Sequence, residues 1–163
     1  MTSRRMSVTL RRPTADEYAA WSAVGLEGYI SEIVASGGLT RAAAEEQARR
    51  EDADLLPHGL DTPGQLIFRL EAAGQPVGWL WLSLQHPYGD PGVGYIYDIV
   101  VDEPFRRRGY GREAMQLAEQ EAKRNGLHAL ALNVFGHNRV ARDLYLSLGY
   151  RETSVRMRKE FRA

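Results

Sequence analysis

The sequence predicts an α/β protein, of α+β type, in which a mixed sheet is flanked by about four helices. Two observations predict this fold class. Three consecutive strand-like segments form a meander in the middle of the chain, and beyond residue 101 the apolar spacing changes from every second residue to every 3.6 residues. The expected order of elements is β-α-α-β-β-β-α-β-α-β. Because 163 residues is an ordinary domain length and no linker or repeat interrupts the chain, we expect a single domain over 1–163.

Helix caps and turn residues set the boundaries in the first half of the chain. Thr14, with Glu17 three residues later, forms a capping box, and Thr40 caps a second helix rich in Ala, Glu and Arg. In the meander, Trp79 and Trp81 share one face and leucines the other, which predicts a central strand covered on both sides. The predicted elements are a strand at 8–12, helices at 15–36 and 41–55, and strands at 65–71, 77–85 and 94–101.

The second half alternates helices with strands. Asn-Gly ends a helix at 111–124, a strand follows at 127–135, and Gly149 ends a helix that spans 138–148. Polar and apolar residues then alternate to the end of the chain, which predicts a last strand at 150–161. One side of that strand carries Glu152, Ser154, Arg156 and Arg158.

Composition excludes several classes of protein. The chain has no cysteine, which removes disulfides, thiolate metal sites and a cysteine nucleophile, and which fits a reducing cytoplasm. The four histidines show no metal-ligand spacing, so no metal is expected. No run reaches membrane-spanning length, and no membrane partner is expected. Residues 1–98 hold 8 basic and 13 acidic residues, a net charge of −5, whereas residues 99–163 hold 13 and 8, a net charge of +5. The second half is therefore suited to an anion.

The most informative segment is 98–112, where an apolar strand leads into three arginines, two glycines and a helix. A helix N-terminus with small residues and nearby guanidinium groups is suited to phosphate. Gly109-Tyr110-Gly111 also matches part of the dinucleotide fingerprint, but the next strand lacks the acidic residue that a nicotinamide cofactor requires. A nucleic-acid site is not expected either, because the basic cluster is short and the net charge is zero. Several arginines at the N-terminus of a helix are unfavourable because that end of the helix dipole is positive, and an anion bound among them would remove the repulsion.

Two motifs resemble those of the GCN5-related N-acetyltransferases (GNAT family). The first is Arg106-x-x-Gly109-x-Gly111 after a strand that ends Val-Val-Asp, which is similar to the family's acetyl-CoA pyrophosphate loop. The second is the run Asn138-x-x-Ala141-x-x-x-Tyr145, followed by Gly-Tyr at 149–150. The order of elements is also similar over nearly the whole chain. The resemblance implies a mostly antiparallel sheet that splays between its fourth and fifth strands.

The resemblance implies an acetyl-CoA site along the fourth strand and the loop. Backbone groups of Ile99, Val100 and Val101 would pair with the pantetheine arm like an added strand. Backbone N–H groups of 107–112 would hold the pyrophosphate, and arginine side chains would add positive charge. Asn138 would bond the cofactor arm, although as an N-cap it has a structural role as well. The full implied cofactor set is Ile99, Val100, Val101, Arg106, Arg107, Arg108, Gly109, Tyr110, Gly111, Arg112, Asn133, Asn138, Ala141 and Tyr145.

The implied reaction is acetyl transfer to a primary amine by direct attack, since the chain lacks a cysteine for an acyl-enzyme. The family pattern implies that Tyr145 is the general acid that protonates the leaving thiolate. The alternative is that Tyr145 serves only in packing. Asp98 alternates with Ile96 and Val100 on an apolar strand face, and it is either a base of raised pKa, acting directly or through water, or a structural carboxylate. Glu27 and Glu32 are weaker base candidates, and the alternative is that they attract a cationic amine instead.

The acceptor itself, a small molecule or a peptide amine, is not identified by the sequence. Homodimers are common in the family, but no residue pattern here demonstrates one. Trp79 and Trp81 either line an acceptor pocket or pack in the core. A second hypothesis is a catalytically silent module that binds acyl-CoA and transfers nothing.

Overall fold

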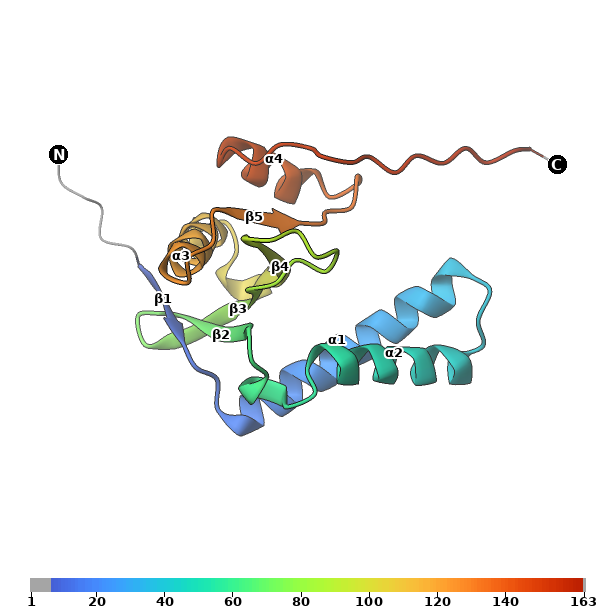
Figure 1. The fold of residues 1–163 in the computed structure, drawn as a ribbon, viewed down its shortest axis with the longest axis horizontal. Coiled ribbons are helices and arrows are strands. Elements are labelled where there is room, and N and C mark those ends of the chain that lie inside the picture. The colour runs from blue at the N-terminus through green and yellow to red at the C-terminus, as the bar shows by residue number, and fades with distance from the viewer. Residues whose placement is uncertain (1–6, 163) are drawn as a thin grey trace. The chain divides into compact units, whose positions relative to one another are not determined.

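The computed structural model describes residues 7–162, and these form two compact units that meet in the sequence between Leu132 and Asn133. The first unit contains a five-stranded sheet in the order β1-β2-β3-β4-β5 (Figure 1). Neighbouring strands are antiparallel except β4 and β5, which are parallel. This arrangement confirms the predicted mixed, mostly antiparallel sheet. The strands are β1 (Val8–Arg11), β2 (Gln65–Ala72), β3 (Gln75–Ser83), β4 (Val93–Val101) and β5 (Ala129–Leu132).

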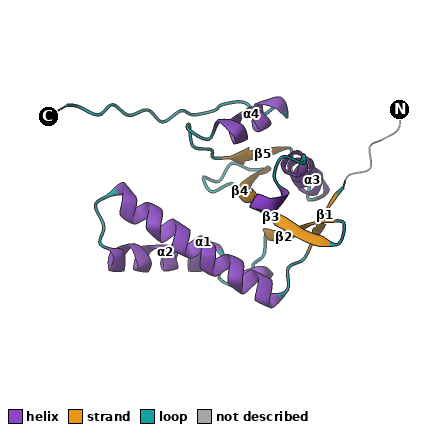
Figure 2. Cartoon of the chain, turned by 180° about the vertical axis from the view of Figure 1, so that it is seen from behind, coloured by secondary structure: helices purple, strands orange, loops and turns teal. Residues whose placement is uncertain are grey.

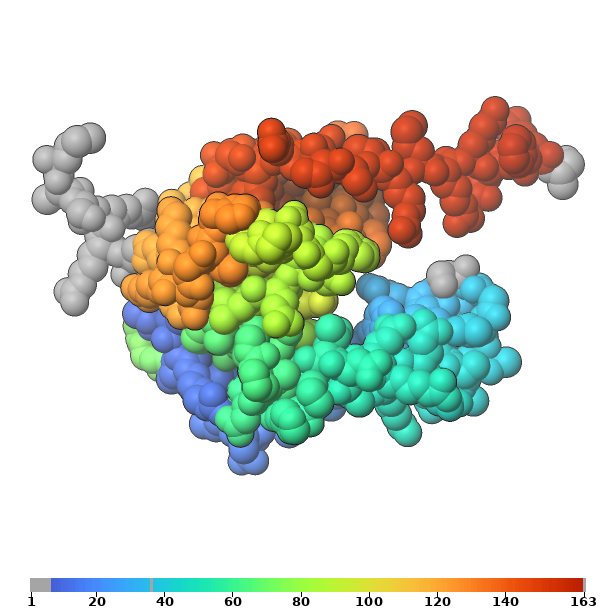
Figure 3. Space-filling view, viewed as in Figure 1, coloured from blue at the N-terminus to red at the C-terminus, as the bar shows by residue number. Residues whose placement is uncertain are grey.

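The predicted capping residues begin their helices. Thr14 caps α1 (Ala15–Ser36) through the capping box with Glu17, and Thr40 caps α2 (Arg41–Leu55) by accepting from the Ala43 N–H. The two helices pack on each other through Ile30, Ala44 and Ala48. They lie side by side and extend beyond the sheet as a helical hairpin, blue to teal in Figures 1 and 3.

The helix α3 (Tyr110–Arg124) packs on the sheet through a buried apolar stripe that includes Met115 and Ala118. Its Glu113 carboxylate accepts from the N–H groups of Ser7 and Val8, which ties the helix to the start of β1. In β3, Trp79, Leu80 and Leu82 are all buried, which confirms that this central strand is covered on both faces. No helix of the described residues combines the length and the apolar character needed to cross a bilayer.

The second unit contains α4 (Arg139–Ser147), and the prediction of a strand after it was wrong. Residues 150–162 carry no secondary structure, and Figure 2 draws them as loop. Side chains from 151 to 162 are exposed, so the alternating polarity is not matched by a buried face. A strand requires a partner for its backbone groups, and alternation alone does not provide one. The predicted strand at 127–135 is also shorter, ending at Leu132.

Candidate functional site

The strands β4 and β5 part after a short stretch of pairing. Their register runs from Val93↔Ala129 to Ile96↔Leu132, and the rest of β4 pairs only with β3 among the described strands. The Asp102 N–H donates to the Val77 carbonyl, so the alternation of an antiparallel ladder turns the backbone groups of Ile99 and Val101 away from β3. Val100 instead directs its backbone groups to β3. The open side of β4 therefore presents the backbone groups of every second residue, here Ile99 and Val101.

A β-bulge at Tyr97 decides which way Asp98 faces. Leu82 pairs with Ile96 whereas Trp81 pairs with Asp98, so Tyr97 is an extra residue in β4. The sequence alternation had placed Asp98 on the same face as Ile96, and this was wrong because the bulge shifts the alternation by one residue. Asp98 shares the face of Trp81, toward α1, and Ile96 shares the opposite face with Leu82.

The Asp98 carboxylate lies in a desolvated position under α1. Burial raises the pKa of Asp98, and hydrogen bonds from the Trp21 indole and the Ile99 backbone partly oppose that increase. Trp21 Nε1 donates to Asp98 Oδ2 at 3.3 Å. Among the described residues, no ion pair includes Asp98. Its surroundings therefore combine a raised affinity for a proton with two neutral hydrogen-bond donors.

The loop between β4 and α3 has the backbone shape of an anion site. Arg107 has φ 65° and Gly109 has φ 83°, so two left-handed residues flank Arg108 immediately before the first turn of the helix. Successive residues of opposite handedness direct their N–H groups into one concavity. The first N–H groups of α3 point the same way, since the first turn of a helix has no intrahelical acceptor for them. α3 begins at Tyr110, one residue before the predicted start.

The arginines of this loop differ in how they are held. Arg106 Nε donates to the Val101 carbonyl at 2.9 Å, which anchors the loop on the end of β4. Arg108 donates to the Pro104 carbonyl at 3.3 Å and lies over the Phe105 ring. All three residues from Arg106 to Arg108 are exposed, as is Arg112 on the first turn of α3. Several positive charges therefore surround the backbone concavity.

The predicted residues of the second unit lie on α4 and just before it. Asn138 is the N-cap of α4, and its Oδ1 accepts from the Ala141 N–H at 3.2 Å, which leaves the amide NH₂ as a donor. Tyr145 lies in the last turns of α4, and its ring centroid is 6.0 Å from that of Tyr150. The Tyr150 N–H donates to the Tyr145 carbonyl. Asn133, at the start of the unit, is exposed.

The two glutamates of α1 have different surroundings. Both oxygens of Glu27 accept from Arg41 of α2, at 2.7 and 2.8 Å, and this contact lowers the pKa of Glu27. Its charge is thus already compensated within the hairpin. Glu32 is exposed on α1.

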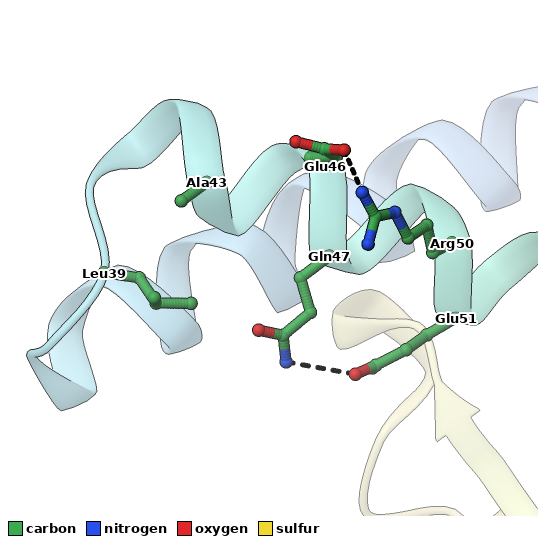
Figure 4. Close-up of a pocket in the computed structure, with 6 residues that line it drawn as sticks. All are labelled: Leu39, Ala43, Glu46, Gln47, Arg50 and Glu51. Atoms are coloured by element: carbon green, nitrogen blue, oxygen red, sulfur yellow. Dashed lines mark hydrogen bonds and ion pairs between the residues drawn. The ribbon is translucent and has the colours of Figure 1, made fainter.

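A surface pocket on the hairpin is lined by none of the predicted site residues. Figure 4 shows its lining on α2 and the preceding turn, where Glu46 pairs with Arg50 and Gln47 donates to Glu51 at 3.0 Å. Glu46 and Arg50 form an ion pair and Gln47 forms a hydrogen bond with Glu51, each pair one helical turn apart. Their geometry offers no reactive group, and the candidate site is the one built on β4 and its following loop.

Three aromatic residues near Asp98 were missed as site candidates by the sequence reasoning. Trp21 of α1 stacks on Trp79 at 5.4 Å and meets Trp81 edge-on at 5.7 Å. Tyr97 stacks on Trp81 at 4.6 Å, and Tyr95 meets Tyr97 at 4.9 Å. The spacing of the two tyrosines was a usable signal, since residues two apart in a strand share a face.

Comparison with known proteins identifies the family. Residues 35–150 match the model of the acetyltransferase (GNAT) family. The chain is 33% identical over 158 residues to the N-acetyltransferase YycN of Bacillus subtilis (strain 168), covering 95% of this chain and 99% of YycN. It is 31% identical over 160 residues to YdgE of the same organism, with the same coverage.

Solved structures agree with this assignment. The crystal structure of YycN superposes with a TM-score of 0.81 at 32% identity, covering 96% of this chain and 99% of that one. An aminoglycoside acetyltransferase, AAC(6')-Iy bound to a bisubstrate analogue, shares the fold with a TM-score of 0.61 at 17% identity, over 96% of this chain and 99% of that one. The matched family model and these full-length relatives place the chain in the GNAT family of N-acetyltransferases, and it is an acyltransferase.

Proposed function

We propose that the protein transfers the acetyl group of acetyl-CoA to a primary amine by direct attack, as a single acetyltransferase domain. The observation that carries this proposal is the backbone concavity at 107–112 beside the open side of β4. A diphosphate fits a concavity of N–H groups at a helix N-terminus surrounded by arginines. The Ile99 N–H already donates to Asp98 and the Val101 carbonyl accepts from Arg106, so the Ile99 carbonyl and the Val101 N–H are the groups proposed to pair with an extended arm in the manner of an added strand. Solved structures of the aminoglycoside acetyltransferase AAC(6')-Iy, which shares this fold, contain CoA or a bisubstrate analogue built on CoA, and this supports CoA as the carrier of the donor group.

The proposed chemistry requires two proton transfers. As the amine nitrogen bonds to the thioester carbonyl carbon and the carbon–sulfur bond breaks, the nitrogen loses a proton and the thiolate gains one. Asp98, with its raised pKa, is suited to take the amine proton, directly or through water. Tyr145 is proposed as the acid that donates to the thiolate sulfur. The chain has no cysteine that could form an acyl-enzyme, and this favours direct transfer.

An acceptor screen with thiol release as the readout tests the proposal. The panel contains simple amines, amino-terminal peptides and aminoglycosides, each with acetyl-CoA, and calorimetry measures CoA binding in parallel. Turnover on at least one amine is expected. Saturable CoA binding with no turnover on any of them would instead establish the silent acyl-CoA-binding module.

The absence of cysteine also leads us to propose a reducing compartment, the cytoplasm, as the place of action.

The substitution Asp98→Asn is expected to lower kcat/KM about 10²-fold at neutral pH and to remove the acidic limb of the pH–rate profile. In the wild type that limb reports protonation of the base, so activity decreases as the pH decreases through the raised pKa of Asp98. The measurement is kcat/KM against pH for both proteins. An unchanged profile in D98N would show that another group takes the proton.

The same substitution is expected to stabilise the fold at neutral pH. Because the pKa of Asp98 is raised above 3.8, the unfolded chain releases this proton at a lower pH than the folded chain does. The wild type therefore loses stability relative to D98N as the pH increases through that window, and the two converge below it. Thermal unfolding at pH 3 and pH 8 measures the difference. A lower Tm for D98N at pH 8 would indicate that the charged carboxylate is structural.

A further inference from the structure

A continuous row of aromatic rings runs along one face of β3 and β4 within the first unit. Starting at α1, Trp21 meets Trp81, Trp81 stacks on Tyr97, Tyr97 meets Tyr95, and Tyr95 meets His86 at 5.6 Å. We call these five residues the aromatic row. The row connects the helix that covers the sheet to the loop after β3.

The aromatic rings on this face differ in how deeply they are buried. Trp79, beside the row, is 8% exposed, with Arg69 over its ring at 4.7 Å and Trp21 stacked on it at 5.4 Å. It belongs to the core cluster formed with Leu56 and Ile67. Trp81, Tyr95 and Tyr97, by contrast, are only partly buried. Trp21 and His86, at the ends of the row, are partly buried as well, so the accessible part of the row includes the tyrosines of β4.

The carboxylate of Asp98 lies next to this accessible part. The β-bulge places Asp98 and Tyr97, consecutive residues, on the same face of β4. The contacts of Asp98 are the Trp21 indole and the Ile99 backbone, both neutral donors, and no ion pair of the described residues includes it. A negative charge without a cation, set beside aromatic ring faces, is a combination that attracts an ammonium group.

The number of uncompensated carboxylates limits the charge of the ligand. In the neighbouring hairpin, Glu27, Glu45 and Glu46 form ion pairs with arginines, whereas Glu51 accepts from the neutral donors Tyr29 and Gln47. On β3 and β4, which carry most of the aromatic row, Asp98 is the one acidic residue. Asp98 is thus matched to one ammonium group, and the rings beside it are matched to an apolar or aromatic group. A polycationic sugar requires more carboxylates than this face offers.

We propose that the acceptor is a primary amine with a single positive charge carried on an aromatic or large apolar group, which lies against Trp81, Tyr97 and Tyr95 with its ammonium group directed to Asp98. This inference rests on the proposed acetyl transfer to an amine and names the class of amine. The aromatic row is then the surface that selects the acceptor. Asp98 holds the ammonium group, which releases its first proton to solvent before the attack, and Asp98 takes the second proton as the amide forms.

Two measurements test the class of acceptor. All three tryptophans of the chain lie in the row or stack on it, so intrinsic fluorescence reports on ligand binding there without turnover. Full-length protein saturated with CoA is titrated with 2-phenylethylamine, ethanolamine and spermidine. Thiol release from acetyl-CoA is then measured with the same three amines. We expect saturable fluorescence change with 2-phenylethylamine, and a kcat/KM at least about tenfold above that of ethanolamine or spermidine.

The variants Tyr97→Ala and Tyr97→Phe separate the ring from its hydroxyl. Tyr97→Ala is expected to remove the preference for 2-phenylethylamine, about a tenfold decrease in the ratio of kcat/KM values, whereas Tyr97→Phe keeps it. If Tyr97→Ala does not fold, Tyr97→Leu keeps an apolar side chain without the ring and gives the same comparison.

The outcomes distinguish this inference from the proposed function. Equal efficiency for all three amines, or a preference for spermidine, overturns the acceptor class while acetyl transfer stands. A preference that survives Tyr97→Ala overturns the role of the row. CoA binding without thiol release from any amine removes the acetyl transfer itself, and the acceptor class with it.

Discussion

Replacement of Tyr145 by Phe is expected to lower kcat by about 10²- to 10⁴-fold while the affinity for CoA stays nearly unchanged. The substitution removes one hydroxyl and keeps the ring that lies 6.0 Å from the ring of Tyr150. Phenol and thiol differ in unperturbed pKa by only about 1.5, near 10 against 8.5, so a phenol is able to protonate a leaving thiolate. The effect falls on kcat because the proton moves only as the carbon–sulfur bond breaks.

The matched control for Tyr145 is its neighbour on the same short unit. Tyr150→Phe also removes a single phenolic hydroxyl, and its ring is the partner of the Tyr145 ring. We expect kcat within about threefold of the wild type for Tyr150→Phe, measured with the same amine. Steady-state kinetics and calorimetry with CoA are carried out on all three proteins. A kcat for Tyr145→Phe equal to that of the control would remove the general-acid assignment.

The second large effect is expected at Gly109, where Gly109→Val should abolish CoA binding. Gly109 is the N-cap of α3 with φ 83°, a conformation that β-branched residues rarely adopt. A Cβ at this position meets no protein atom within 4 Å, so the substituent projects into open space at the N-terminus of the helix. There it blocks the approach of a diphosphate to the backbone N–H groups, and backbone strain distorts the concavity.

The other end of α3 provides a control for strain alone. Gly126 has φ 77°, and a Cβ there also meets nothing within 4 Å. Gly126→Val should therefore destabilise the fold by an amount similar to Gly109→Val, and it should bind CoA normally. Thermal unfolding and calorimetric titration of both variants separate the two effects. Normal CoA binding by Gly109→Val would show that the diphosphate is held elsewhere.

Local chemistry made much of the fold predictable. The caps at Thr14 and Thr40 act within three residues of the helix they begin, so their positions are visible in the sequence. The role of Gly109 is equally local, because glycine adopts the left-handed conformation before a helix without the steric cost that other residues have. The last strand failed as a prediction because its existence depends on a partner, and the alternation at 150–161 says nothing about where that partner is.

The sequence by itself determined the family signature, the order of the elements that formed and the loop proposed to bind an anion, because each depends on residues a few positions apart. The tertiary structure alone decided that Asp98 faces α1, that Trp21 donates to it, and that β4 leaves β5 after Ile96. These features follow from the register between strands and from a one-residue bulge. Register is set by pairing across the sheet, between residues far apart in the chain, and a shift of one residue reverses the face of every side chain beyond it.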